Sequence, residues 1–138
     1  MKSQKKTLKF FLWNTLCVIL LSCIINSIIW IALHGIPIIG LPKIESVKSV
    51  TIVYNATQKI EIIDNENIAL LIKSANLLNY KIKGKMEGSP IISITYHMKN
   101  GNDINIEANN TTMWWHGKPH TIKEKNVFVD IIQGLFFE

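Results

Sequence analysis

The chain has 138 residues, with fifteen lysines, no arginine and ten acidic residues, which gives a formal net charge of +5. Most of the positive excess lies in the first nine residues, which contain Lys2, Lys5, Lys6 and Lys9 and no acid, whereas residues 36–138 carry eleven lysines and ten acids. Because most of the chain is close to neutral, it lacks the basic footprint of a nucleic-acid-binding protein, and we exclude DNA and RNA as partners.

The first predicted element is a long apolar helix behind a basic tail. Residues 10–33 form a run of 24 side chains without a charge. As a helix, at about 1.5 Å per residue, this run would reach roughly 36 Å, which exceeds the ~30 Å hydrocarbon core of a bilayer. We predict a cytoplasmic tail over residues 1–9 and a transmembrane helix over residues 10–34. The lysines precede the span, so the positive-inside rule predicts a single-pass cell-membrane protein with an extracytoplasmic C-terminal part.

Two other interpretations of the apolar run stay open beside this signal anchor. A cleaved signal peptide has a shorter apolar region, of about 7–15 residues, and small residues at the cleavage site. Leu20-Leu21-Ser22-Cys23 resembles a lipobox, in which Cys23 would be acylated, although Leu21 fits that pattern badly and the chain stays apolar after Cys23. We favour the intact anchor.

Three polar residues, Thr15, Ser22 and Asn26, lie within about 40° of one another around the predicted span. An asparagine inside a membrane can form a hydrogen bond with a neighbouring helix, which is worth roughly 1 kcal/mol. This stripe predicts contact with a polytopic membrane protein or with a second copy of the chain.

Residues 35–43 contain two glycines and two prolines, and we predict a linker there. The extracytoplasmic domain then covers residues 44–138. Both cysteines, Cys17 and Cys23, lie in the span, so the outer domain has none. Its stability must come from an apolar core rather than from disulfides.

The outer domain alternates between two hydrophobic periods, that of strands and that of helices. Asp64 stands at the expected N-cap of the first helix, and Asn100-Gly101 is a strong hairpin signal. The expected strands cover residues 50–54, 59–63, 92–98, 104–108, 112–116 and 120–123, with a turn at 117–119. The first expected helix runs from its N-cap at residue 64 to residue 78, and the second covers residues 127–137. The order ββαββββα predicts an α+β domain, a small antiparallel sheet with two helices packed on one face.

The use of lysine alone as the basic residue, with abundant isoleucine and asparagine, is typical of an AT-rich genome, and we interpret the source as a low-GC, Gram-positive bacterium. The run from residue 92 to 136 resembles small extracytoplasmic domains of such bacteria, in which short strands surround an Asn-Gly hairpin and a helix follows. The resemblance supports the α+β fold.

Candidate residues for chemistry are few. His97, His116 and His120 are possible ligands for zinc or copper, and His116 and His120 would approach one another if they faced each other across the turn. The alternative is that all three are surface strand residues. Asp103 and Glu107 share a strand face but would lie about 13 Å apart, too far to act as a catalytic carboxylate pair. Without a phosphate loop or a nucleophile motif, we expect no catalytic machinery and no cofactor.

Trp114 and Trp115 should point to opposite faces of a strand, one into the core and one outward. The outward tryptophan, with His116, is our candidate for partner binding. Lys81, Lys83 and Lys85 form a basic strip that is typical of a solvated edge and that also fits anionic headgroups or wall polymers. The sequence favours a membrane-anchored binding or accessory protein, of sensing, regulatory or immunity type. The alternative is a structural envelope-associated domain.

Overall fold

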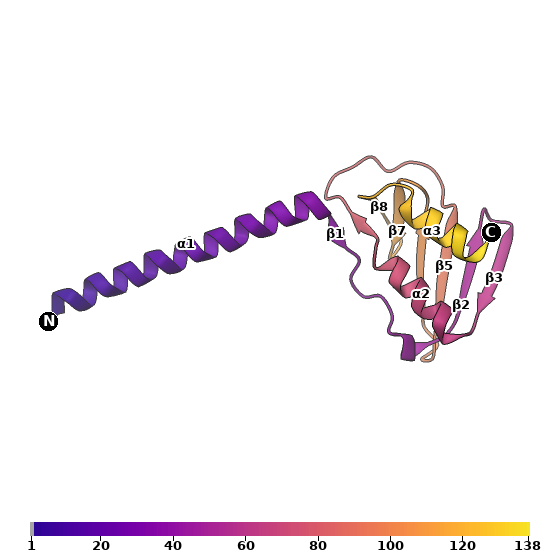
Figure 1. The fold of residues 1–138 in the computed structure, drawn as a ribbon, viewed down its shortest axis with the longest axis horizontal. Helices are drawn as coiled ribbons and strands as arrows, with labels where there is room; N and C mark the ends of the chain where they lie inside the picture. Colours follow the sequence, from indigo (N-terminus) through magenta and orange to yellow (C-terminus); the bar gives the residue numbers. More distant parts are fainter. Residues whose placement is uncertain (1) are drawn as a thin grey trace. The chain divides into compact units, whose positions relative to one another are not determined.

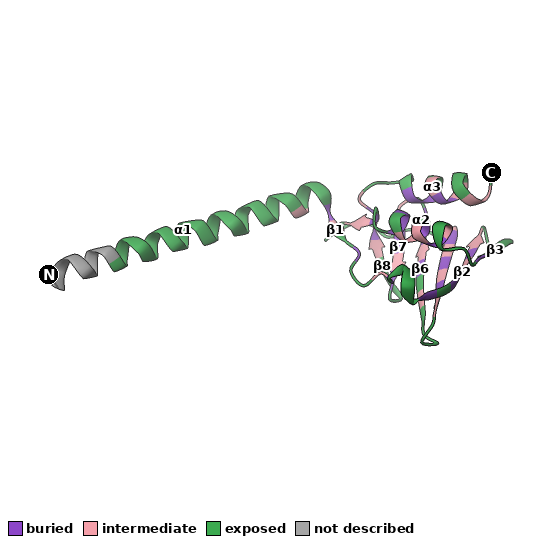
Figure 2. Cartoon of the chain, turned by 60° about the horizontal axis from the view of Figure 1, so that its bottom comes forward, coloured by how far each residue is buried: buried purple, intermediate pink, exposed green. Residues whose placement is uncertain are grey.

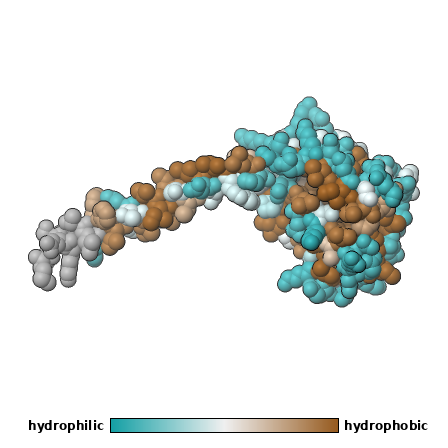
Figure 3. All heavy atoms as spheres, in the orientation of Figure 1, coloured by the Kyte–Doolittle hydropathy of each residue, from teal (hydrophilic) through white to brown (hydrophobic). Residues whose placement is uncertain are grey.

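The computed structural model describes the backbone of residues 2–138 and the side chains from Lys9 onward. The chain divides into two units, one that ends at His34 and one that covers Gly35–Glu138. The first unit is the helix α1 (Lys2–His34), which includes the backbone of the lysine-rich start. Its segment Lys9–His34 is long and apolar enough to cross a membrane, and Figure 3 shows mostly apolar residues along it.

The second unit is built on a six-stranded antiparallel sheet with the spatial order β3-β2-β5-β6-β7-β8. Two helices, α2 (Asn65–Ala75) and α3 (Val127–Phe136), lie on one face of this sheet (Figures 1 and 2). A short 3-10 helix (Ile44–Ser46) leads into the first long strand. The six strands are β2 (Val47–Tyr54), β3 (Gln58–Ile62), β5 (Ile92–Met98), β6 (Asp103–Ala108), β7 (Thr112–Trp115) and β8 (Lys118–Thr121).

The hydrophobic core lies between the helices and the sheet face that they cover. Ile52, Ile94, Ile106 and Trp115 are partners in register across four neighbouring strands, and all four are buried. Because strand side chains alternate between faces, this register also places the residues between them on the opposite face of the sheet. We call the helix-covered side the closed face and the opposite side the open face.

The α+β fold and the predicted order of its main elements are confirmed. Asp64 is the N-cap of α2, and its Oδ1 accepts a hydrogen bond from the backbone N–H of Asn67 at 2.9 Å. The Asn100-Gly101 hairpin joins β5 and β6, with Gly101 at a φ of 85° that an Asn-Gly turn supplies without strain. The helix α2 ends at Ala75, three residues before its expected end, although Leu78 is still buried.

Two short strands are additions that the sequence did not predict. β1 (Ile36–Pro37) pairs with β4 (Asn79–Tyr80), so the segment expected to be a linker belongs to the second unit. Ile38, in the same segment, is part of the core. The pairing escaped prediction because each strand has two residues, too few for a periodic pattern.

The turn between β7 and β8 was expected at residues 117–119 and lies one residue earlier, at His116 and Gly117. Trp115 pairs with Lys118, and the two residues between them have φ values of 50° and 71°. Positive φ at both positions is the conformation of a two-residue type I′ turn. Pro119 therefore lies in β8, where the outer edge of the sheet needs no N–H donor from it.

Candidate functional site

The open face of the sheet is the candidate functional site, because both helices of the second unit pack on the other side. On β5 and β6 its side chains alternate with those of the core and are half-buried or exposed, whereas Thr112 of β7, on the same face as Trp114, is buried and contacts Glu87. Most side chains of the open face are polar, whereas the core side chains that alternate with them include many isoleucines. The open-face residues that concern us are Thr51, Ser93, Thr95, His97, Asp103, Asn105, Glu107 and Trp114.

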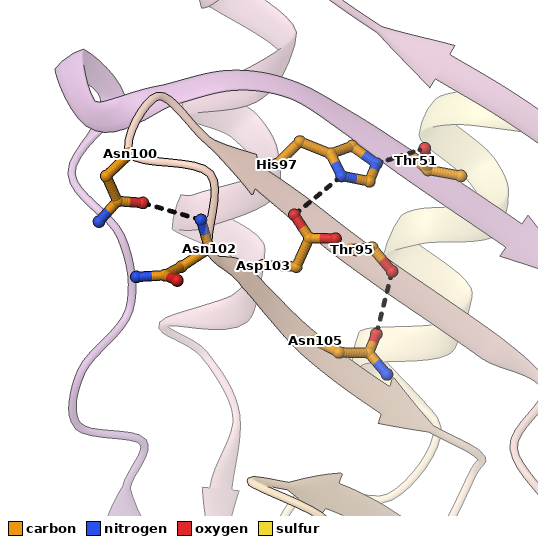
Figure 4. A network of polar contacts seen from close by, with 7 residues as sticks. All are labelled: Thr51, Thr95, His97, Asn100, Asn102, Asp103 and Asn105. Carbon is orange, nitrogen blue, oxygen red and sulfur yellow. Dashed lines mark hydrogen bonds and ion pairs between the residues drawn. The ribbon is translucent and has the colours of Figure 1, made fainter.

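A chain of hydrogen bonds joins Thr51, His97 and Asp103 on three neighbouring strands (Figure 4). The imidazole Nδ1 of His97 lies 3.0 Å from Oδ1 of Asp103, and Nε2 lies 2.9 Å from the Thr51 hydroxyl. An ionised carboxylate only accepts, so the proton of the neutral ring belongs on Nδ1, and Nε2 accepts from the threonine. The two contacts fix the ring on the sheet surface at both nitrogens.

A second group of hydrogen bonds continues along the same face. Oδ1 of Asn105 accepts from the hydroxyl of Ser93 at 3.2 Å and from that of Thr95 at 3.3 Å (Figure 4 draws the second). Asn105 of β6 is paired with Thr95 of β5, and Ser93, paired with Glu107, reaches it diagonally. The polar side chains of the open face are thus held in place by cross-strand contacts before any partner arrives.

The order hydroxyl, imidazole, carboxylate is also that of a nucleophilic triad. A triad hydrolase needs, in addition, N–H donors directed at the oxyanion that forms. Thr51 lies inside β2, between β3 and β5, where the ladders on both sides use the backbone N–H groups. The Thr51–His97–Asp103 chain fixes three side chains of neighbouring strands on the open face.

The predicted partner-binding residues occupy three different environments. Trp114 and Trp115 point to opposite faces, as alternation requires, and Trp115 is in the core. Trp114 is half-buried on the open face, between Glu107 of β6 and Pro119 of β8. His116 is exposed in the turn, with its ring 4.1 Å from that of Trp115. Of the three, Trp114 is the one that belongs to the open face.

The three histidines proposed as metal ligands also lie apart. His97 is on the open face, and His116 is in the β7–β8 turn. His120 is opposite Met113 rather than opposite His116, and its ring lies 4.5 Å from that of Tyr80. Among the side chains described, from Lys9 onward, no group of three His, Cys, Asp or Glu residues could hold a metal ion.

The polar residues of the span form hydrogen bonds within α1. The Thr15 hydroxyl donates to the carbonyl of Phe11 at 2.9 Å, and Nδ2 of Asn26 donates to the carbonyl of Ser22 at 2.8 Å. Cys23 is exposed on the same continuous helix. The donors are satisfied without a second helix, while the Asn26 amide oxygen has no hydrogen bond from the described residues and could accept one.

The lysines that set the predicted topology lie at the start of α1. Lys9 is exposed. Lys2, Lys5 and Lys6 lie on the helix backbone, and their side chains fall outside the described residues.

Sequence reasoning singled out His97 but missed its partners. The hairpin signal predicted that the two strands pair, but a two-residue Asn-Gly turn would place His97 opposite Ile104; the observed hairpin shifts the register by one residue, so Asp103 lies opposite His97. Thr51 carried no such signal, because nothing local indicates that β2 pairs with β5, more than 40 residues away.

Comparisons with protein families, with curated proteins and with solved structures found no match to this chain.

Proposed function

We propose that this chain is a membrane-anchored binding protein, with its N-terminus in the cytoplasm and its α+β domain outside the cell. Its role is that of an accessory protein, of sensing, regulatory or immunity type, which engages a protein of the membrane or envelope. The span Lys9–His34 and the lysines before it support the location. The open face supports the binding role.

The observation that carries the proposal is the ordered set of polar side chains on the sheet face that α2 and α3 do not cover. Cross-strand hydrogen bonds hold its side chains in fixed positions. Here Thr51, His97 and Asp103 form one fixed group, and Ser93, Thr95 and Asn105 form another. Fixed polar groups lose little conformational entropy on binding, which favours affinity. Trp114, at the side of these groups, offers a large apolar contact of the kind that dominates protein interfaces.

The location is tested by labelling single cysteines on intact cells. In a chain with Cys17→Ala and Cys23→Ala, we would introduce either Lys59→Cys on the exposed strand β3 or Ser3→Cys ahead of the span. A membrane-impermeant maleimide should label the first and leave the second unlabelled until the cells are opened. Labelling of Ser3→Cys alone would reverse the proposed topology. A mass increase that depends on Cys23 would favour the lipoprotein alternative.

The binding role is tested by photo-crosslinking in cells from two exposed positions of the full-length chain. Asn105 lies on the open face, and Lys73 lies on α2 at the helix side of the sheet. A photo-reactive residue at position 105 should give a discrete crosslinked product that is lost when Trp114→Ala is added. The same residue at position 73 is the matched control and should give none. Equal crosslinking from both positions, or none from either, would favour the structural envelope role.

A further inference from the structure

A loop rich in lysine follows β4 and lies against the edge of the sheet. It covers residues 81–87, Lys81-Ile82-Lys83-Gly84-Lys85-Met86-Glu87, and we call it the lysine loop. Of the eleven lysines in residues 36–138, six lie in residues 81–87 or 118–125, together with two of the ten acids. This edge therefore carries a net charge of +4, and the rest of the second unit carries −3.

The sheet holds the lysine loop in a defined position. The backbone N–H of Lys81 donates to the carbonyl of Thr121 at 2.9 Å, and the Thr121 hydroxyl donates to the carbonyl of Lys85 at 3.2 Å. Gly84 lies so close to Thr121 that a Cβ at this position would collide with its side chain. At the end of the loop, the N–H of Glu87 donates to the Thr112 hydroxyl at 3.0 Å. The lysines thus extend from a fixed backbone.

The chain connects this edge directly to the end of the apolar helix. Gly35 is bonded to His34, the last residue of α1, and Ile36 pairs with Tyr80, the residue before the loop. A Cβ on Gly35 would lie 2.9 Å from the carbonyl oxygen of Tyr80 and 3.3 Å from Cβ of Lys123. Consecutive Cα atoms are 3.8 Å apart. If α1 spans a bilayer, the peptide bond from His34 to Gly35 and the pairing of β1 with β4 therefore keep the start of the loop near the membrane surface.

The side chains of the loop match such a surface. A hollow of about 280 Å³ is lined by Lys81, Lys83, Lys85 and Lys125, together with Glu87, which forms an ion pair with Lys85 at 2.8 Å. Between the lysines, Ile82 is 72% exposed and Met86 is 52% exposed. Exposed apolar residues flanked by lysines are typical of segments that lie in the membrane interface. A soluble phosphate would need the lysines but would gain nothing from the isoleucine or the methionine.

We propose that the lysine loop binds anionic lipid headgroups of the bilayer that holds α1, with Ile82 and Met86 inserted at the interface. This inference rests on the membrane anchoring proposed above. A lysine near an anionic surface contributes roughly a fivefold gain in affinity. The contact would fix the second unit at the membrane.

The test uses the full chain in nanodiscs of phosphatidylcholine, with or without phosphatidylglycerol. The rate at which an amine reagent acetylates each lysine is followed by mass spectrometry. Phosphatidylglycerol should slow the labelling of Lys81, Lys83, Lys85 and Lys125 about fivefold, and high salt should remove this protection. Lys59, Lys73 and Lys99, on β3, α2 and the β5–β6 hairpin, are the internal controls and should be labelled at the same rate in both lipids.

Two triple variants with the same loss of charge distinguish headgroup binding at the lysine loop from a general effect of the chain's net charge. Lys81→Gln/Lys83→Gln/Lys85→Gln should remove the protection of Lys125, whereas Lys59→Gln/Lys73→Gln/Lys99→Gln, with the same loss of charge, should keep it. Equal labelling in both lipids would overturn the headgroup assignment. Protection in pure phosphatidylcholine by added inorganic phosphate would also overturn it, in favour of a soluble phosphate ligand. Failure of the chain to co-purify with the discs would instead contradict the anchoring itself.

Discussion

The two faces of the six-stranded sheet are made by alternate residues of the same strands, but they contain different interactions. On β5, Ile92, Ile94 and Tyr96 are fully buried on the closed face, while the residues between them form side-chain hydrogen bonds to neighbouring strands on the open face. Burial of apolar surface is worth far more than a half-exposed hydrogen bond. The closed face stabilises the fold, and the proposed recognition surface lies on the opposite side of the same sheet, a division that substitutions can test.

The largest effect is expected on the closed face, from Ile94→Ala. Ile94 is fully buried at the centre of the sheet, between Ile52 and Ile106, so the substitution leaves a cavity. It should lower the free energy of unfolding by about 2–5 kcal/mol. Equilibrium urea unfolding of the detergent-solubilised chain, followed by near-ultraviolet circular dichroism, measures the loss. Thr95→Ala, at the next residue and on the open face, is the control and should lower the free energy of unfolding by less than about 1 kcal/mol. Equal losses in the two variants would contradict the division of roles between the faces.

Tyr96→Phe should act in the opposite direction. The Tyr96 hydroxyl is buried, and it has no hydrogen-bond partner among the described residues. Its removal relieves an unsatisfied polar group, so the variant should be more stable by roughly 1 kcal/mol at neutral pH. Burial also raises the pKa of the phenol, so the unfolded chain ionises first as the pH rises through about 10.0. The unfolded state then binds fewer protons, and the wild-type chain should lose stability there.

The same unfolding assay, repeated across alkaline pH, decides this point. The advantage of Tyr96→Phe should increase above pH 10.0. A variant that is less stable than the wild type at neutral pH would indicate that the hydroxyl has a partner, such as a buried water.

The closed face was the more predictable of the two because local patterns specify it. Alternating isoleucines predicted β5 and its inward face, Asp64 predicted the start of α2, and Asn100-Gly101 predicted the β5–β6 hairpin. The open-face network depends on which strands become neighbours, and Thr51 meets His97 only because β2 lies beside β5. Long-range pairing has no local sequence signal, so a site made from three strands could not be assembled from the sequence.

A substitution of Asp64, the N-cap of α2, should weaken a helix that packs on the closed face without changing the sheet itself. The hydrogen bond from the Asn67 backbone N–H, and then that from its side-chain amide, hold the pKa of Asp64 below its ordinary value of 3.8. A lowered pKa stabilises the fold above the unfolded pKa, and this contribution is lost as the pH falls through the folded pKa. Asp64→Ala should therefore lower the Tm at neutral pH, and the difference from the wild type should shrink at the acidic end.

Asp64→Asn is the matched control for that prediction. Asparagine is as good an N-cap as aspartate but does not titrate. Its Tm at neutral pH should lie above that of Asp64→Ala, and it should lack the wild type's acid-dependent loss. If both variants behaved alike at every pH, the capping hydrogen bond would not be the cause of the effect.

His97→Ala should have the smallest effect on stability and a large effect on recognition. The His97 side chain is 36% exposed and the Asp103 side chain is 54% exposed, so solvent screens the contact between them. Loss of this contact should lower the free energy of unfolding by less than about 1 kcal/mol. On the open face, however, the substitution releases both Thr51 and Asp103 from fixed positions. Crosslinking from position 105 should therefore fall several-fold while the urea midpoint stays nearly constant. Lys99→Ala, an exposed change in the same hairpin, should alter neither measurement. A large loss of stability in His97→Ala, with crosslinking retained in the folded fraction, would mean that the open face maintains the fold, and the division of roles between the two faces would no longer hold.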